Sequence, residues 1–389
     1  MMLDLALTEP QRLLCRAIAD EPVAVREDAV RQLWEQLGDQ AAFALAQENQ
    51  VAPLLAHVLM EIFGSEVPAP WRQAHEETFQ RLSLYLGELD RLAARLAEDG
   101  IPLVALKNGG IARGIFPCPG CCPMGDLDVL VEKRHFRRAH ELLQDADYTF
   151  EFRSPLEKAS LEAAEQGGGA EYWKILPGGA RLWLEMQWRP VAGRWIRPDQ
   201  EPKAEELLAR SIPIPGSAAR LLAPEDNLLQ VALHTAKHSY VRAPGFRLHT
   251  DVDRIVRRQP LNWDLFLTRV ISLAVKTPVY FSLAIPQSLF GTPIPEEVLA
   301  GLKPPAWKIA LITGWLQRVG LFNPDAPKFG RVGFVFFTAL LYDDLKGLLR
   351  GLFPGTAWMR AHYRVNCSWL LPYYYGRRLM DLALHRVST

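Results

Sequence analysis

The sequence predicts an α+β fold in which a small mixed sheet, at about residues 101–200, is flanked by helical regions at about 1–100 and 201–389. Apolar residues recur at helical spacing in both flanking regions. Between them, short apolar runs alternate with polar residues and are separated by Gly and Pro, which is typical of strands. A length of 389 residues also suits one core with helical additions.

Helices are expected throughout about residues 8–98. Thr8 and Gln11 form the pattern of a capping box, so the first helix should begin at this point. Pro53 is placed to open a later helix, and the Pro-Ala-Pro sequence at 68–70 marks a break. A long leucine-rich helix at about 71–98 then leads into the first strand.

The apolar run at 126–131 carries two acidic residues, Asp126 and Asp128. Side chains alternate in a strand, so both aspartates should point to one face while Leu127 and Val129 point to the other. Two such carboxylates repel each other unless a cation lies between them or one holds a proton. Oxygen ligands of this kind suit Mg²⁺, which binds one or two carboxylates together with substrate phosphates.

Lys107, Asn108, Gly109 and Gly110 follow the preceding apolar run at 103–106. The glycine pair allows close approach of a ligand to the backbone. A helical segment is expected directly after it, and the free N–H groups of a helix N-terminus favour phosphate. The sequence therefore predicts a phosphate-binding turn next to the aspartate pair.

The rest of the central region predicts two helices and three strands. Glu185 lies in the last of these strands and shares a face with Trp183 and Gln187. It is either a third acid of the site or an exposed residue of an amphipathic hairpin. The expected helices are at 134–145 and 154–165, and the expected strands at 148–152, 171–176 and 181–188.

This arrangement resembles the DNA polymerase β-type nucleotidyltransferase superfamily, and in detail its branch of uncharacterised bacterial nucleotidyltransferases. The resemblance depends on Leu-Lys-Asn-Gly-Gly at 106–110, Phe-Pro at 116–117 and Pro-Met-Gly-Asp-Leu-Asp-Val-Leu-Val at 123–131. The Glu-Met-Gln-Trp sequence at 185–188 stands where the branch has an acid, an apolar residue and His-Trp. The likeness extends from about residue 101 to about residue 270.

The resemblance implies a metal-dependent nucleotidyltransferase. Asp126, Asp128 and Glu185 would be the catalytic and metal-binding residues, holding two Mg²⁺ ions. A nucleoside monophosphate, by default AMP from ATP, would move to a hydroxyl or similar group of an acceptor that the sequence does not identify. The acceptor is either a small molecule or a protein.

Nucleotide contacts are expected from Lys107, Asn108, Gly109, Gly110 and Lys237. The first four come from the turn after the first strand. Lys237 lies near the end of a helix that begins at about residue 224, where it is either a phosphate partner or a solvated side chain.

Three departures from the branch leave a second interpretation open. Asn108 separates Lys107 from the glycine pair, whereas the branch has Lys directly before Gly. Cys122 stands where the branch has an Arg before the first aspartate, and Gln187 stands where it has His. The alternative is therefore a catalytically inactive nucleotidyltransferase-like protein that binds a nucleotide or a peptide or protein partner. A third interpretation is that the pair of Asp126 and Asp128 binds a structural cation.

Composition limits the class of partner and the location. Lys plus Arg equals Asp plus Glu at 44 each, so long nucleic acid is not an expected partner. Charged Glu9 and Arg12 follow the N-terminus closely, which argues against a secretory signal and favours a cytoplasmic protein without membrane contact. The apolar run at 332–342 is shorter than the ~20 residues that span a bilayer and predicts a buried helix.

Cysteine and histidine pairs leave further alternatives. Cys118, Cys121 and Cys122 crowd into one loop, but a zinc site needs a second Cys or His pair, and none is evident at ligand spacing. Free thiols in a reducing cytoplasm are the simpler interpretation, and a reversible disulfide is the alternative. His234 and His238 share a helix face, either as a metal pair or, as we prefer, as hydrogen-bonded core residues.

Overall fold

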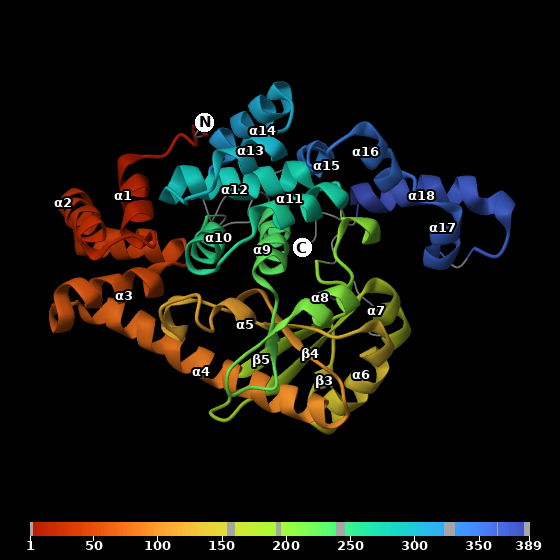
Figure 1. The fold of residues 1–389 in the computed structure, drawn as a ribbon, viewed down its shortest axis with the longest axis horizontal. Helices are drawn as coiled ribbons and strands as arrows, with labels where there is room; N and C mark the ends of the chain where they lie inside the picture. Colours follow the sequence, from red (N-terminus) through yellow and green to blue (C-terminus); the bar gives the residue numbers. More distant parts are fainter. Residues whose placement is uncertain are drawn as a thin grey trace.

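The computed structural model describes residues 3–153, 160–191, 196–238, 246–322, 331–363 and 365–384. It confirms the α+β fold, with a seven-stranded mixed sheet and helical regions from both ends of the chain. In Figure 1 the sheet occupies the lower half, and most of the C-terminal helices form a layer above it.

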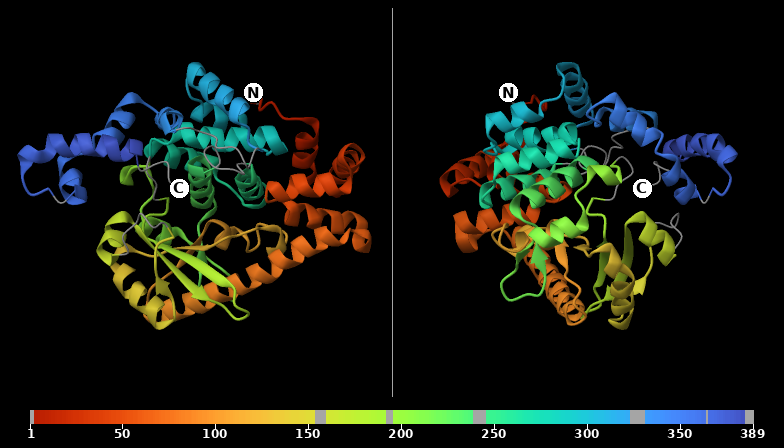
Figure 2. Two further views of the ribbon diagram at one scale, coloured as in Figure 1. Left: turned by 180° about the vertical axis from the view of Figure 1, so that it is seen from behind. Right: turned by 45° about the vertical axis from the view of Figure 1, so that its right-hand side comes forward.

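The N-terminal region consists of helices, as predicted. The capping box of Thr8 and Gln11 is present, and the long helix α4 runs beside the sheet in both views of Figure 2. α4 thereby connects the helical region to the sheet. The four helices are α1 (Glu9–Ile18), α2 (Val23–Glu48), α3 (Ala52–Phe63) and α4 (Ala69–Glu98).

The sheet has the strand order β3-β4-β5-β2-β1-β7-β6. β2 pairs in parallel with β5 and β1 pairs in parallel with β7, whereas the other neighbours are antiparallel. The strands are β1 (Val104–Leu106), β2 (Leu127–Leu130), β3 (Thr149–Phe150), β4 (Gly169–Ile175), β5 (Arg181–Gln187), β6 (Ile212–Pro213) and β7 (Arg220–Leu221). The helices between them are α5 (Lys107–Ile111), α6 (Phe136–Asp145), α7 (Leu161–Gly167) and α8 (Ala204–Arg210).

The central strands separate two apolar clusters. Leu127 and Val129 of β2 belong to the main core. Leu130, on the opposite face, packs with Val104 and Leu106 against α8 in a smaller cluster. The alternation predicted for this strand is therefore confirmed, and it leaves Asp128 on the same side as Leu130.

The C-terminal region is helical as expected, and none of its described helices, nor any other described helix, combines the length and apolar character needed to cross a membrane. Its helices are α9 (Pro224–His238), α10 (Arg247–Arg258), α11 (Trp263–Ser272), α12 (Lys276–Phe290), α13 (Glu296–Leu302), α14 (Ala306–Val319), α15 (Arg331–Leu340), α16 (Leu345–Leu352), α17 (Thr356–Tyr363) and α18 (Leu371–Leu384).

Two details differ from the sequence-based expectations, and one expectation falls partly outside the described residues. Strands β6 and β7 were missed and extend the sheet to Leu221, beyond the expected core. The helix expected at 154–165 falls partly on 154–159, outside the described residues, and its described part forms α7. The run at 332–342 forms most of α15, but the prediction that it is buried is wrong for Phe336, which is 65% exposed beside buried Phe337.

Candidate functional site

Three acidic residues lie on two neighbouring central strands and in the loop before one of them. Asp128 lies in β2, Asp126 directly precedes that strand, and Glu185 of β5 is paired in register with Asp128. Residues paired across neighbouring strands lie about 4.8 Å apart and project from the same face. Both carboxyl groups approach the same ammonium nitrogen, Nζ of Lys107, which lies 2.5 Å from Asp128 and 3.7 Å from Glu185.

Asp128 is the most enclosed of these acids. Its side chain is 6% exposed, whereas the side chains of Asp126 and Glu185 are both 28% exposed. Burial raises the pKa of Asp128 well above its usual value; Lys107 opposes this increase, and the negative charges of Asp126 and Glu185 add to it. A proton or a cation is therefore needed to keep the two paired carboxyl groups together.

Lys107 places an ammonium group beside these acids. Its Nζ lies 2.5 Å from Oδ1 of Asp128 and 3.7 Å from Oε2 of Glu185. Burial opposes its charge, but the three acids, Asp128 foremost, raise the pKa of Lys107 above its usual value. The residue has a φ of +50° at the junction of β1 and α5, a conformation that costs about 1 kcal/mol for a residue with a Cβ.

Two further side chains complete the polar group. Nε2 of Gln187 donates a hydrogen bond to Oδ1 of Asp128 at 3.1 Å. Nη2 of Arg153 lies 2.7 Å from Oδ2 of Asp126, and its backbone N–H donates to Glu171. Arg153 was not predicted as a site residue, because it follows the two-residue strand β3 and belongs to no motif. The acids thus have basic or amide partners from three separate segments.

The turn that was expected to bind phosphate forms the short helix α5 itself, so the expectation of a helix that begins only after the glycine pair is wrong, and the turn has a packing role. Nδ2 of Asn108 donates to the carbonyl of Pro123 at 3.1 Å, which ties α5 to the loop before Asp126. Gly109 and Gly110 are buried. A Cβ on Gly110 would lie 2.9 Å from the carbonyl oxygen of Ala105, so only glycine allows α5 to pack this closely on β1.

The histidine pair and the lysine of α9 lie on another segment. The rings of His234 and His238 have centroids 4.6 Å apart, in a tilted arrangement. Within the described part of the chain, they do not belong to a group of three or more side chains that could hold a metal ion. The side chain of Lys237 lies outside the described residues, and its phosphate contact stays a prediction.

A cavity of about 580 Å³ opens beside the loop that leads to Asp126. Residues of α2 and α4 form much of its wall, and Gly125 borders it directly before Asp126. Two arginines, Arg81 and Arg247, and three glutamines, Gln47, Gln50 and Gln73, give it a polar lining. It can therefore accept a small polar molecule, although the acidic group of Asp126, Asp128 and Glu185 does not line it.

Comparison with known proteins gives one family. The model of a family described as "Uncharacterised nucleotidyltransferase" matches residues 35–291. This range includes α3, α4, the whole sheet and the helices from α5 to α12, so it contains every described residue of the acidic group. No curated protein and no solved structure matches the chain.

Proposed function

Because the chain belongs to the family of uncharacterised nucleotidyltransferases, we propose that its acidic group transfers a nucleoside monophosphate, with AMP from ATP as the first candidate, to a hydroxyl or similar group of an acceptor. One observation supports this most: the in-register pairing of Asp128 with Glu185 brings two carboxyl groups from separate strands to the same ammonium group of Lys107, at 2.5 and 3.7 Å. Lys107 adds a cation that can pair with phosphate.

The donor set fits Mg²⁺ in its chemistry, since it consists of carboxylate oxygens. Asp126, Asp128 and Glu185 would hold the ions after their side chains move closer together, because within the described part of the chain their ligand oxygens do not all lie within 4.8 Å of one another. Bound magnesium supplies charge neutralisation for the triphosphate and lowers the pKa of an attacking hydroxyl. Lys107 and Asn108 are partly exposed and would orient the phosphates, whereas buried Gly109 and Gly110 keep the turn close to β1.

The reaction forms a bond from the acceptor oxygen to the α-phosphorus and breaks the bond from that phosphorus to pyrophosphate. The acceptor proton needs a base, and a carboxylate oxygen of Glu185 that is not bound to a metal ion would take it, because this side chain is 28% exposed. Most of the rate enhancement would come from positioning and charge neutralisation. The polar cavity beside Gly125 is the proposed acceptor site.

One observation favours the alternative of an inactive nucleotide-binding or partner-binding protein. Lys107 and Arg153 already neutralise Asp128 and Asp126, and a protein that no longer bound magnesium would retain such internal ion pairs. Catalysis requires that these pairs open when the metal–nucleotide complex binds.

Labelled ATP distinguishes the two functions. The purified protein is incubated with cell extract, Mg²⁺ and ATP that carries the label on either the α- or the γ-phosphate. Nucleotidyl transfer labels an acceptor from α-labelled ATP but not from γ-labelled ATP. ATP binding by calorimetry without any labelled acceptor would support the inactive alternative and contradict transfer.

A further inference from the structure

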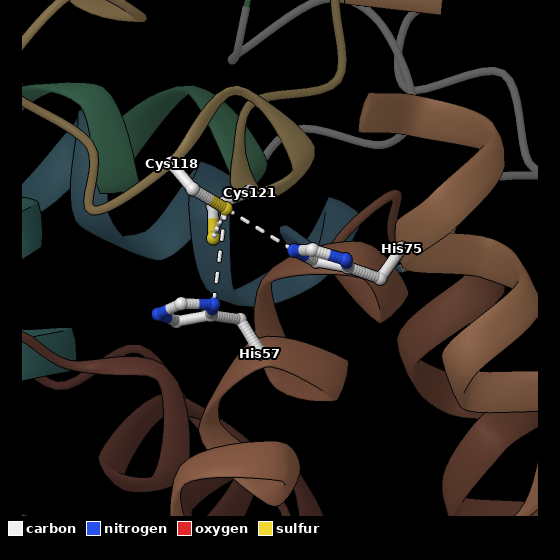
Figure 3. A group of neighbouring side chains, drawn as sticks. All are labelled: His57, His75, Cys118 and Cys121. Atoms are coloured by element: carbon white, nitrogen blue, oxygen red, sulfur yellow. Dashed lines mark hydrogen bonds between the residues drawn. The ribbon is translucent and has the colours of Figure 1, made fainter. Parts of the chain in front are cut away.

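A second group of reactive side chains lies outside the acidic group. His57 comes from α3, His75 from α4, and Cys118 and Cys121 from the loop around a 3₁₀ turn, η2 (Pro119–Cys121). Figure 3 shows the four side chains pointing toward one another. The expectation that no second ligand pair accompanies these cysteines is therefore wrong. The histidines are 61 and 43 residues from Cys118 in sequence, and only the fold brings them together.

The distances within this group are close to those of a tetrahedral metal site. Sγ of Cys118 lies 3.1 Å from Nε2 of His75, 3.1 Å from Sγ of Cys121 and 3.7 Å from Nδ1 of His57. Ligand atoms around a tetrahedral zinc ion are about 3.3–3.8 Å apart, given Zn–S and Zn–N bonds of about 2.3 and 2.0 Å. Small side-chain shifts are therefore enough to surround an ion.

We propose that His57, His75, Cys118 and Cys121 bind a Zn²⁺ ion in a structural site. Two sulfur and two imidazole ligands form a donor set that zinc prefers over magnesium or calcium. All four positions come from the protein, which leaves no open position for water or substrate. Among the described residues, this is the one group of three or more His, Cys, Asp or Glu side chains whose ligand atoms lie within 4.8 Å of one another.

The surroundings of the group support the assignment. A Cβ on Gly120 would lie 2.5 Å from Nε2 of His75, so the glycine makes room for the histidine ring over the turn. The other ring nitrogen of His57, Nε2, faces Oε1 of Glu61 at 3.6 Å, and Arg26 pairs with Glu61. A carboxylate behind a histidine ligand is the usual arrangement that orients the ring and fixes its tautomer.

The ion would attach the loop at 118–122 to the helical pair α3 and α4. This loop continues through Pro123, whose carbonyl binds Asn108, into Asp126. Zinc would therefore fix the segment that precedes the acidic strand. The proposal does not depend on whether the acidic group transfers nucleotides, because the zinc ligands and the acids are different residues.

Metal content tests the proposal. Purified wild-type protein should contain about one zinc ion per chain by elemental analysis. Cys118→Ser and His75→Asn should each lower zinc content or affinity at least tenfold, as loss of one ligand removes a large share of the binding energy. The control is Cys367→Ser, which changes an exposed cysteine and should retain the zinc.

Two more measurements keep the test decisive if a variant fails to fold. Wild-type protein stripped of metal should bind Co²⁺ and show the visible absorption of tetrahedral thiolate coordination. In denaturant with chelator and no reductant, all five cysteines should react as thiols. A wild-type protein that binds neither zinc nor cobalt, zinc retained in full by Cys118→Ser, or a thiol count that shows a Cys118–Cys121 disulfide would each overturn the assignment.

Discussion

The ammonium nitrogen of Lys107 lies 2.5 Å from Oδ1 of Asp128, which also accepts a hydrogen bond from Gln187. This lysine neutralises part of the negative charge of the two paired acids, which would otherwise be costly to bury. In the proposed function it exchanges a carboxylate partner for a phosphate oxygen when the nucleotide binds. Its position therefore connects the stability of the site to nucleotide affinity.

Replacement of Lys107 should weaken nucleotide binding. For Lys107→Met, we expect the affinity for ATP with Mg²⁺ to fall about tenfold, because one charge-assisted hydrogen bond to phosphate is lost. Titration calorimetry measures this change. Lys303→Met, at an exposed lysine of the helical region, is the control and should leave affinity unchanged. Equal affinity of both variants would show that Lys107 does not contact the nucleotide.

The two neighbouring glycines should respond differently to alanine. Gly110→Ala places a Cβ 2.9 Å from the carbonyl oxygen of Ala105 and 3.2 Å from a methyl group of Leu221. We expect its free energy of unfolding to fall by about 1–3 kcal/mol. Gly109→Ala meets only ordinary contacts of 3.6 Å or more and is the matched control. Similar stability of both variants in urea denaturation would contradict the packing role of Gly110.

Glu88 of α4 should stabilise the contact between this helix and the sheet. Its Oε1 accepts hydrogen bonds from Nζ of Lys174 at 2.7 Å and from the hydroxyl of Tyr148 at 3.1 Å, and Arg91 pairs with Oε2. For Glu88→Gln, we expect the free energy of unfolding at pH 7 to fall by about 2–3 kcal/mol. Glu35→Gln, at an exposed position, should have little effect.

The decrease in the free energy of unfolding caused by Glu88→Gln should depend on pH. Burial opposes the charge of Glu88, but hydrogen bonds from Lys174 and Arg91 hold its pKa below the ordinary value of 4.5. The stabilisation is complete above the pKa of the unfolded chain and is lost as pH falls through the lower pKa of the folded chain. In denaturation experiments, the difference in the free energy of unfolding between wild type and Glu88→Gln should therefore be smaller at pH 3 than at pH 7. An equal difference at both pH values would refute the ionic role.

Asp251 of α10 should have the opposite effect on the pH dependence of stability: it should make the free energy of unfolding fall as pH rises. Burial raises its pKa from 3.8 to about 6, against the lowering effect of Arg247 and Arg254, and its Oδ1 has no hydrogen-bond partner among the described residues. The folded chain therefore keeps a proton that the unfolded chain releases between about pH 4 and 6, and stability falls as pH rises through this window.

Asp251→Asn should remove this pH dependence. At pH 7.5 we expect its free energy of unfolding to exceed that of wild type by about 1–3 kcal/mol, because no charge is buried. Denaturation curves at pH 4 and pH 7.5 measure the slope. Asp145→Asn, at an exposed aspartate of α6, should behave like wild type. A variant less stable than wild type at pH 7.5 would show that the charged form of Asp251 is favoured in the fold.

Local patterns in the sequence predict much of this structure. The capping box fixes the start of α1, and alternation in β2 separates Asp128 from Leu127 and Val129. The hairpin of β4 and β5 was predicted from turn residues and alternation, which placed Glu185 on a definable face. In each case, a few neighbouring residues carry the whole signal.

Contacts between distant segments left no such pattern. The pairing of Asp128 with Glu185 spans 57 residues and was expected only from family resemblance. The ion pair between Arg153 and Asp126 and the approach of His57 and His75 to Cys118 had no local signal. Strands β6 and β7 have two residues each, too few to show a period. Tertiary packing determines these features, so the spacing of residues along the chain does not predict them.

The most direct test of the acidic site compares Asp128→Asn with Asp145→Asn in the assay with α-labelled ATP. Both changes remove one carboxylate charge, but only the first lies beside Glu185 and Lys107. We predict that Asp128→Asn lowers the transfer rate by about 10³-fold or more with the circular dichroism of wild type, and that Asp145→Asn retains full activity. Transfer by Asp128→Asn at the wild-type rate would contradict the proposed site.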